Sequence, residues 1–293
     1  MLCACIDIGT NTTRVLVAEA AQGRLTEVLA GKVFTRMGRG LGAGGALAPE
    51  KIAEVADVVA RQRELAEELG AAPVRVVATA AIRAAPNREA FVAAVRARAG
   101  VAVEILDGAS EARLAFLGAT RTFGRPLHGR VGVVDVGGGS CELAVGTLAE
   151  GVSWSASFAV GSGLLADLHL HSDPPAAAEL AAVRDHALGV FGGEDVPAPD
   201  CAVAVGGSAA SLTTLVGAVL EPATLRRALD VLSGATAADV ARRFSLIPER
   251  VRLLPAGILI LDAASQRFGL PLEIGRGGIR EGVLLELAAD GGA

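Results

Sequence analysis

The fold is decided by the stretch Asp135–Glu142, DVGGGSCE, in which an acid ends an apolar run and three glycines lead to a second acid. Consecutive glycines let a backbone approach a ligand closely, because no Cβ stands in the way. The carboxylates of Asp135 and Glu142 flank the loop, where they can share a divalent cation. Three glycines alone would also suit a flexible turn, so the interpretation depends on what surrounds them.

The same arrangement occurs near the N-terminus, in the stretch Asp7–Arg14, DIGTNTTR. Here too an acid ends an apolar strand and a small polar turn follows. The glycine and hydroxyl residues leave backbone N–H groups free to approach phosphate oxygens, while Asp7 can hold a metal ion or a metal-bound water. An ordinary hairpin turn would explain this stretch by itself. Its repetition at 135–142 favours a duplicated phosphate-handling unit.

Apolar runs around both stretches predict two similar antiparallel meanders, each followed by helices and further strands. A duplicated unit of this kind predicts two similar α/β lobes with a cleft between them. The predicted strands are 2–8, 14–20, 24–34, 74–78, 101–106, 131–136, 142–146, 152–158, 201–205 and 272–274, and the main predicted helices are 49–70, 88–99, 109–123, 175–191 and 280–288.

A third loop, Val205–Ala209, VGGSA, ends a strand and opens a helix. Such a turn presents N–H groups and the helix dipole to an anion. Any strand-to-helix turn needs small residues, so this loop alone is weak evidence for a phosphate site. It supports one only because it is the third such loop at the same predicted edge of the fold.

Composition narrows the class of protein. The chain has 293 residues, 52% of them hydrophobic, which is enough for two domains with cores of their own. A net charge of −5 argues against a nucleic-acid binder. The apolar start, Met1–Ile8, is too short for a signal peptide or a membrane span, so we expect no membrane association and a cytoplasmic location. Four cysteines without a C-x-x-C pair predict free thiols.

The three loops resemble the phosphate-one, phosphate-two and nucleotide-binding loops of the superfamily that contains actin, sugar kinases and chaperone ATPases. Between them, Ala78–Arg83, ATAAIR, and Ser110–Leu114, SEARL, resemble segments of the exopolyphosphatase / guanosine pentaphosphate phosphohydrolase (Ppx/GppA) family. Three later segments resemble that family in the expected order: Pro248–Arg250, Leu254–Gly257 and Gly278–Gly282.

This resemblance implies an α/β fold of two actin-like (ribonuclease H-like) lobes with a central interdomain cleft, in the short two-domain form. Domain I is expected at 1–118 plus 281–293, and domain II at 119–280. The implied activity is metal-dependent hydrolysis of the terminal phosphoanhydride bonds of inorganic polyphosphate, releasing orthophosphate. Guanosine pentaphosphate is an alternative substrate for the same site, and homodimers are frequent in the family.

The resemblance also assigns roles to residues. Glu111 is expected to be the catalytic base that orients or deprotonates the attacking water, although an acid in the first turn of a helix can also be a simple dipole partner. Mg²⁺ or another divalent cation is expected on Asp135 and Glu142, with help from Asp7. The expected phosphate-binding residues are Gly9, Thr10, Asn11, Thr12, Arg14, Arg83, Gly137, Gly138, Gly139, Ser140, Gly206, Gly207 and Ser208.

Some positions depart from the family pattern or stay open. Ser110 stands where many members have glutamate, Cys141 and Ser208 where threonine is usual, and Arg39 where glutamate is frequent. Arg113 can face phosphate or pair with a neighbouring carboxylate. Arg36 and Arg39 are weaker candidates for contacts with the following phosphates. The four histidines follow no motif, and we assign them no role.

Two other kinds of function compete with the hydrolase. An actin-like kinase or ATPase would share the loops but not Glu111 in its SEARL segment. A non-catalytic sensor of polyphosphate or an alarmone would not need Glu111, Asp135 and Glu142 together.

Overall fold

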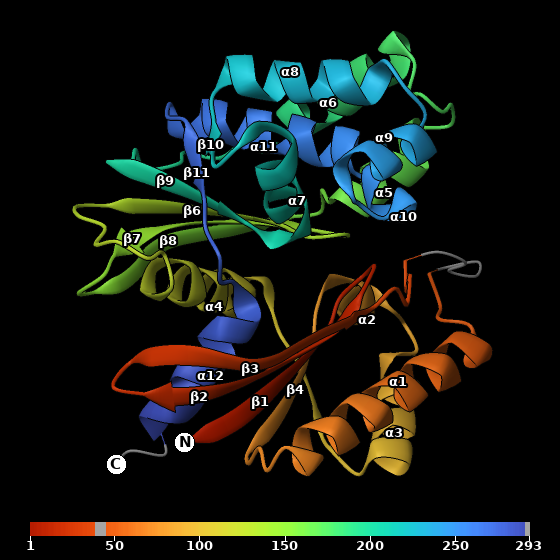
Figure 1. Ribbon diagram of the computed structural model, residues 1–293, viewed down its shortest axis with the longest axis vertical. Coiled ribbons are helices and arrows are strands. Elements are labelled where there is room, and N and C mark those ends of the chain that lie inside the picture. Colours follow the sequence, from red (N-terminus) through yellow and green to blue (C-terminus); the bar gives the residue numbers. More distant parts are fainter. Residues whose placement is uncertain (39–44, 291–293) are drawn as a thin grey trace. The chain divides into compact units, whose positions relative to one another are not determined.

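The computed structural model describes residues 1–38 and 45–290, and it divides the chain into two compact units. Unit 1 contains Met1–Thr122 and Gly277–Ala293, and unit 2 contains Phe123–Arg276 (Figure 1). The chain therefore passes from one unit to the other twice. Within the described ranges, no helix has the length and apolar character needed to cross a membrane.

Unit 1 is built on a five-stranded sheet with helices on both faces. The strand order is β3-β2-β1-β4-β5, in which β1 to β3 form an antiparallel meander and β4 and β5 run parallel to β1. Its strands are Leu2–Ile8 (β1), Thr13–Ala21 (β2), Arg24–Val33 (β3), Val74–Ala78 (β4) and Val103–Ile105 (β5). Its helices are Pro49–Glu68 (α1), Ala80–Ala84 (α2), Arg88–Ala99 (α3), Gly108–Arg121 (α4) and Ile279–Asp290 (α12).

The alternation of side chains along β1 separates two cores in unit 1. Ala4, Ile6 and Ile8 pack into the cluster that includes α1 and α3, whereas Cys3 and Cys5 pack into the cluster that includes α4 and α12. This is the period of two that a strand buried on both faces requires. Asp7 shares the face of the two cysteines, which is the face covered by α12.

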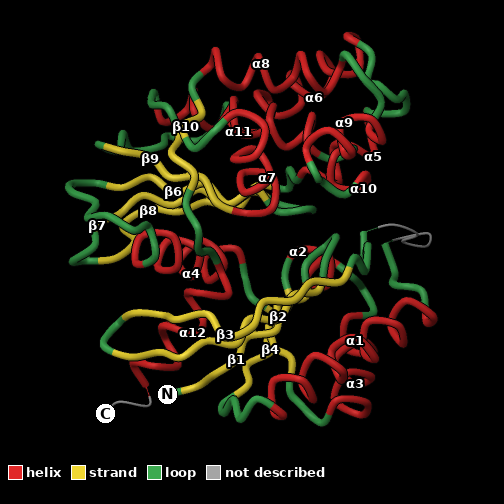
Figure 2. The backbone as a smooth tube through the Cα atoms, in the orientation of Figure 1, coloured by secondary structure: helices red, strands yellow, loops and turns green. Residues whose placement is uncertain are grey.

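Helix α12 crosses α4 with the two backbones in contact (Figure 2). A Cβ on Gly118 would overlap the carbonyl of Gly278, and a Cβ on Gly282 would overlap the carbonyl of Leu114. Only glycine permits so close a crossing, because any side chain would separate the helices.

Unit 2 repeats the sheet of unit 1 and adds more helices. Its sheet order is β10-β11-β9-β6-β7-β8, with β6 to β8 antiparallel and β9 and β11 parallel to β6. Its strands are Val131–Val136 (β6), Cys141–Thr147 (β7), Gly151–Phe158 (β8), Cys201–Val205 (β9), Val219–Leu220 (β10) and Leu272–Ile274 (β11). Its helices are Ser162–His169 (α5), Ala177–Phe191 (α6), Gly206–Val216 (α7), Pro222–Ser233 (α8), Ala237–Phe244 (α9), Pro248–Val251 (α10) and Leu254–Phe268 (α11).

Helix α11 forms the centre of the unit 2 core. Of its 15 residues, 12 are buried, and nine of these join one hydrophobic cluster with α6, α8 and the sheet (Figure 1). A helix that is apolar on nearly all sides must be surrounded by protein. The predicted duplication extends to detail, because the ladder shifts register after Val17 in β2 and after Val145 in β7, each ten residues beyond the acid that opens its loop.

Candidate active site

In the loop between β1 and β2, carbonyl groups accept hydrogen bonds from the protein, whereas amide groups remain available to bind a ligand. The Gly9 amide donates to the Thr12 carbonyl at 3.0 Å, which closes a tight turn. The carbonyls of Thr10 and Asn11 accept from the amides of Gly38 and Arg36 at 3.1 and 3.0 Å. Among residues 1–38 and 45–290, the amides of Thr10 and Asn11 have no acceptor. Free, successive amides of this kind suit an anion such as phosphate.

Asp7 and Arg14 lie directly opposite each other at the base of this loop, as Cα partners in the β1–β2 ladder. Burial raises the pKa of the Asp7 carboxyl, and the nearby cations Arg14 and Arg280 oppose that rise. The Oδ1 atom of Asp7 is buried and has no hydrogen-bond partner within the described residues. A buried, unpaired carboxylate oxygen is costly unless a proton or a cation is supplied.

Glu111 and Arg83 are brought together within unit 1. Glu111 lies in the first turn of α4, which Asp107 caps by accepting from the Ser110 amide at 2.7 Å. Its side chain is only 2% exposed and forms an ion pair with Nη1 of Arg83. The same nitrogen donates to the Leu106 carbonyl at 2.8 Å. Arg83 thus orients the carboxylate expected to act as the base, a contact that the sequence did not predict.

The glycine loop of unit 2, between β6 and β7, has the same turn as the loop of unit 1. The Gly137 amide donates to the Ser140 carbonyl at 3.0 Å. The Gly137 carbonyl accepts from the amide and the hydroxyl of Ser162, and the Gly138 carbonyl accepts from the next two amides of α5. In the described part of the chain, the amides of Gly138 and Gly139 have no acceptor. This loop therefore also presents amides rather than carbonyls.

Asp135 and Glu142 flank the glycine loop as direct Cα partners in the β6–β7 ladder. Both are buried, and the Ser157 hydroxyl donates to Oε1 of Glu142 at 2.8 Å. Two acids directly opposite each other on one sheet face repel, so the pair favours a bound cation. Over residues 1–38 and 45–290, no group of three or more His, Cys, Asp or Glu side chains is arranged to hold a metal ion. The pair can thus supply two oxygen ligands, which is what Mg²⁺ commonly takes from a protein.

The third loop, at the start of α7, packs directly against Asp135. Gly206 has a φ of +92°, and a Cβ there would lie 2.6 Å from Oδ1 of Asp135. Glycine is thus required both for the backbone conformation and for the close approach. The Ser208 side chain is fully buried, its hydroxyl has no hydrogen-bond partner among the described residues, and it faces Gly257 of α11. Its hydroxyl therefore faces the core, and only its main chain is left to meet an anion.

Comparison with known proteins identifies the chain. The sequence profile of the Ppx/GppA phosphatase family matches residues 16–290. The chain belongs to the Ppx/GppA phosphatase family.

One curated relative aligns with nearly the whole chain, and a second aligns with somewhat less than two thirds of it. Exopolyphosphatase 1 of Mycobacterium leprae is 30% identical over 309 aligned positions, which cover 98% of this chain and 91% of that protein. Exopolyphosphatase 2 of Mycobacterium tuberculosis is 38% identical over 190 positions, which cover 62% of this chain and 59% of that protein.

Solved Ppx/GppA structures have the same fold. The crystal structure of the Aquifex aeolicus family member superimposes with a TM-score of 0.82 at 27% identity and covers 100% of this chain and 99% of that one. An exopolyphosphatase from Cytophaga hutchinsonii gives a TM-score of 0.87 at 20% identity, covering 99% and 98% of the two chains. The predicted family and the predicted α/β fold with two actin-like lobes are confirmed.

The predicted site residues of this Ppx/GppA protein fall into two sets, one in each unit. The unit 1 set is Asp7, Gly9, Thr10, Asn11, Thr12, Arg14, Arg83 and Glu111. The unit 2 set is Asp135, Gly137, Gly138, Gly139, Ser140, Glu142, Gly206, Gly207 and Ser208. Arg113 forms an ion pair with Glu286 of α12, and Arg39 lies outside the described residues.

Three residues near these sets were not predicted. Arg280 acts on Asp7 from the first turn of α12, Ser157 binds Glu142, and Ser162 holds the glycine loop. Arg280 lies in the Gly278–Gly282 segment that carries part of the family resemblance. The sequence therefore pointed to this segment but not to the interaction of Arg280 with Asp7. Ser157 and Ser162 act through contacts that are distant in sequence and carry no local signal.

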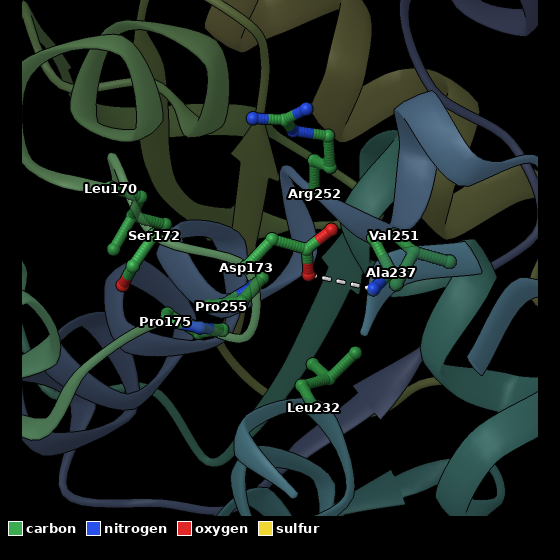
Figure 3. A pocket seen from close by; sticks show the side chains of 9 residues that line it. All are labelled: Leu170, Ser172, Asp173, Pro175, Leu232, Ala237, Val251, Arg252 and Pro255. Atoms are coloured by element: carbon green, nitrogen blue, oxygen red, sulfur yellow. Dashed lines mark hydrogen bonds between the residues drawn. The ribbon is translucent and has the colours of Figure 1, made fainter. Parts of the chain in front are cut away.

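The structure has a pocket in unit 2 (Figure 3). It measures about 350 Å³ including space open to solvent, and the Oδ1 atom of Asp173 accepts from the Ala237 amide within it at 2.7 Å. No predicted site residue lines it. The lining residues are Leu170, Ser172, Asp173, Pro175, Leu232, Ala237, Val251, Arg252 and Pro255.

Proposed function

We propose that this Ppx/GppA protein is an exopolyphosphatase, which hydrolyses the terminal phosphoanhydride bond of inorganic polyphosphate. The observation that carries the proposal is the buried Glu111, oriented by Arg83 and placed in the SEARL segment that resembles the hydrolase branch of the superfamily. The names of the curated relatives support the same activity. Four free thiols, three of them buried, fit the cytoplasmic location that we also propose.

In the proposed reaction, the free amides of Thr10, Asn11, Gly138 and Gly139 bind phosphate oxygens, and Arg14 adds a positive charge. Glu111 accepts a proton from water as the water oxygen bonds to the terminal phosphorus. The bond between that phosphorus and the bridging oxygen breaks. The products are orthophosphate and a chain shorter by one phosphate.

The residues fit a divalent cation, because Asp135 and Glu142 are buried, lie directly opposite each other and offer carboxylate oxygens as ligands. We propose that this pair holds Mg²⁺. We also propose that Asp7, whose buried Oδ1 has no hydrogen-bond partner among the described residues, is a further carboxylate that supports binding of the divalent cation. When bound, Mg²⁺ neutralises phosphate oxygens and assists departure of the shortened chain.

The test measures orthophosphate release with Mg²⁺ from short polyphosphate, long polyphosphate, guanosine pentaphosphate and ATP. We expect release from polyphosphate and a loss of roughly 10² to 10⁴ in kcat for Glu111→Gln, the range for removal of a general base. Glu89→Gln serves as the matched control, because Glu89 lies on α3 with a side chain that is 84% exposed.

Each outcome separates one part of the proposal. Release from guanosine pentaphosphate alone would make that nucleotide the substrate of the same site. No release from any of the four compounds would leave a binding protein and refute the hydrolase. Full turnover by Glu111→Gln would refute the assignment of the base and leave the activity intact.

A further inference from the structure

His169 and His186 point their ring nitrogens at each other in unit 2. His169 ends α5 and His186 lies in α6, and the distance from Nε2 of His169 to Nδ1 of His186 is 3.0 Å. The ring centroids are 5.2 Å apart and the ring planes meet at 73°. Both side chains are half-buried. The pair takes no part in the proposed reaction.

We propose that His169 and His186 form a binding site for a divalent transition-metal ion of the Zn²⁺ class. Two imidazole nitrogens on one tetrahedral zinc, each about 2.0–2.1 Å from the metal, lie about 3.3 Å apart. The observed 3.0 Å is within a few tenths of an ångström of that separation, and a rotation of each ring by about 35° turns both nitrogens toward a common ion. Imidazole nitrogen is also a preferred ligand for Zn²⁺, Ni²⁺ and Cu²⁺ and a poor one for Mg²⁺.

Metal binding requires only an internal proton shift. A hydrogen bond between two neutral imidazoles needs one facing nitrogen protonated and the other bare. When the metal binds, the proton on the facing nitrogen moves to the far nitrogen of the same ring, through solvent. Both facing nitrogens then offer a lone pair, and no proton is lost overall.

The protein supplies two ligands at this site, so water completes the coordination. Over residues 1–38 and 45–290, no third His, Cys, Asp or Glu joins the pair in a metal-binding arrangement. Two protein ligands give a weaker site than the three or four of catalytic and structural zinc centres. The site is therefore exchangeable, and its occupancy follows the free metal concentration.

A bound metal ion would connect α5 to α6. It would do so at the C-terminal end of α5, the helix whose N-terminal end bonds to the glycine loop. The eight residues of α5 span about 12 Å, with Ser162 bound to the Gly137 carbonyl at one end and His169 at the other. A metal that fixes His169 to His186 limits movement of this helix.

The experiment titrates the full chain with Zn²⁺ in buffer containing excess Mg²⁺, and follows the long-range ¹H–¹⁵N spectrum of the imidazole rings. The chain has four histidines, so the spectrum holds few signals to assign. We expect the signals of His169 and His186 to shift together with one Zn²⁺ per chain. Shifts confined to His128 or His171, or no shift at all, would overturn the proposal.

Calorimetry with single variants gives a second readout. His169→Gln and His186→Gln should each weaken Zn²⁺ binding at least about tenfold, because even loss of a group that merely supports a ligand costs 10- to 100-fold. The matched controls His128→Gln and His171→Gln should bind as the wild type does. Unchanged binding by both pair variants would refute the site, and the spectrum of the wild type decides the question if either variant fails to fold.

Discussion

The loops at Asp7 and Asp135 share a backbone and differ in charge. In each loop an acid is followed seven residues later by its Cα partner on the next strand, and the turn between them closes with a 3.0 Å hydrogen bond. The partner of Asp7 is the cation Arg14, whereas the partner of Asp135 is a second acid, Glu142. One scaffold therefore gives a nearly neutral hairpin suited to anions and an acidic hairpin suited to a cation.

The support beneath the two loops also differs. The unit 1 carbonyls are held by amides of the segment after β3, and the unit 2 carbonyls are held by the N-terminus of α5. In both cases the result is the same, since amides remain available for phosphate. The two loops therefore share one property, which is that their carbonyls are bonded and their amides stay available. They differ in the segments that donate to those carbonyls and in the charges of the flanking residues.

Among changes to the charged residues of the two hairpins, the largest expected effect comes from making the acidic hairpin less acidic. Glu142→Gln keeps the side-chain shape and an oxygen for the Ser157 hydroxyl, but removes one charge of the pair. We expect kcat on polyphosphate to fall on the order of 100-fold or more, because a catalytic metal supplies several kcal/mol. Titration of activity with Mg²⁺ should show a higher requirement.

The same variant should be more stable than the wild type when Mg²⁺ is removed, by about 0.2–1 kcal/mol, since like charges across a ladder destabilise it. Urea unfolding with a chelator measures this difference. Glu150→Gln, at the exposed β7–β8 turn, is the control. Normal turnover and a normal Mg²⁺ requirement of Glu142→Gln would show that the second acid of the unit 2 hairpin is not needed to bind the metal.

A second effect, on stability rather than on turnover, is expected at the glycine that packs on Asp135. Gly206→Ala combines a positive φ, which costs roughly 1–2 kcal/mol, with an overlap that adds about 1–3 kcal/mol. Gly124 has nearly the same φ, +89°, and open space around it, so Gly124→Ala serves as the control for a positive φ without an overlap. Urea unfolding should show the larger loss for Gly206→Ala. Equal losses would mean that Asp135 moves aside without cost.

The smallest effect concerns the titration of Asp7. Its folded pKa is raised by burial, so the folded protein holds the proton more tightly than the unfolded chain does. Stability from this group is therefore present at low pH and declines as the pH rises from about 3.9, the ordinary value, through the raised pKa. Asp7→Asn should remove this decline in metal-free unfolding measured at several pH values. The same slope in Asp7→Asn and wild type would contradict it.

Local patterns predicted the strands well, because alternation along β1 and the short apolar runs of β6 and β9 are properties of adjacent residues. They missed α2 and β10, which are five and two residues long and too short to show a period. The contacts that shape the candidate site were also not predicted. Arg83 and Glu111 are 28 residues apart, and the burial of Ser208 depends on Gly257. A serine after two glycines looks like a loop residue until the helix that covers it is known.

The close crossing of α12 over α4 has a consequence for synthesis of the chain. Cys3, Cys5 and Leu16 pack against Val283 and Leu284, so this face of the unit 1 sheet stays incompletely covered until α12 leaves the ribosome. The intervening unit, residues 123–276, takes about 8 to 30 s to translate at 5–20 residues per second. Unit 1 therefore begins first but is completed only when α12 is made, and its sheet has an incompletely covered apolar face during that interval.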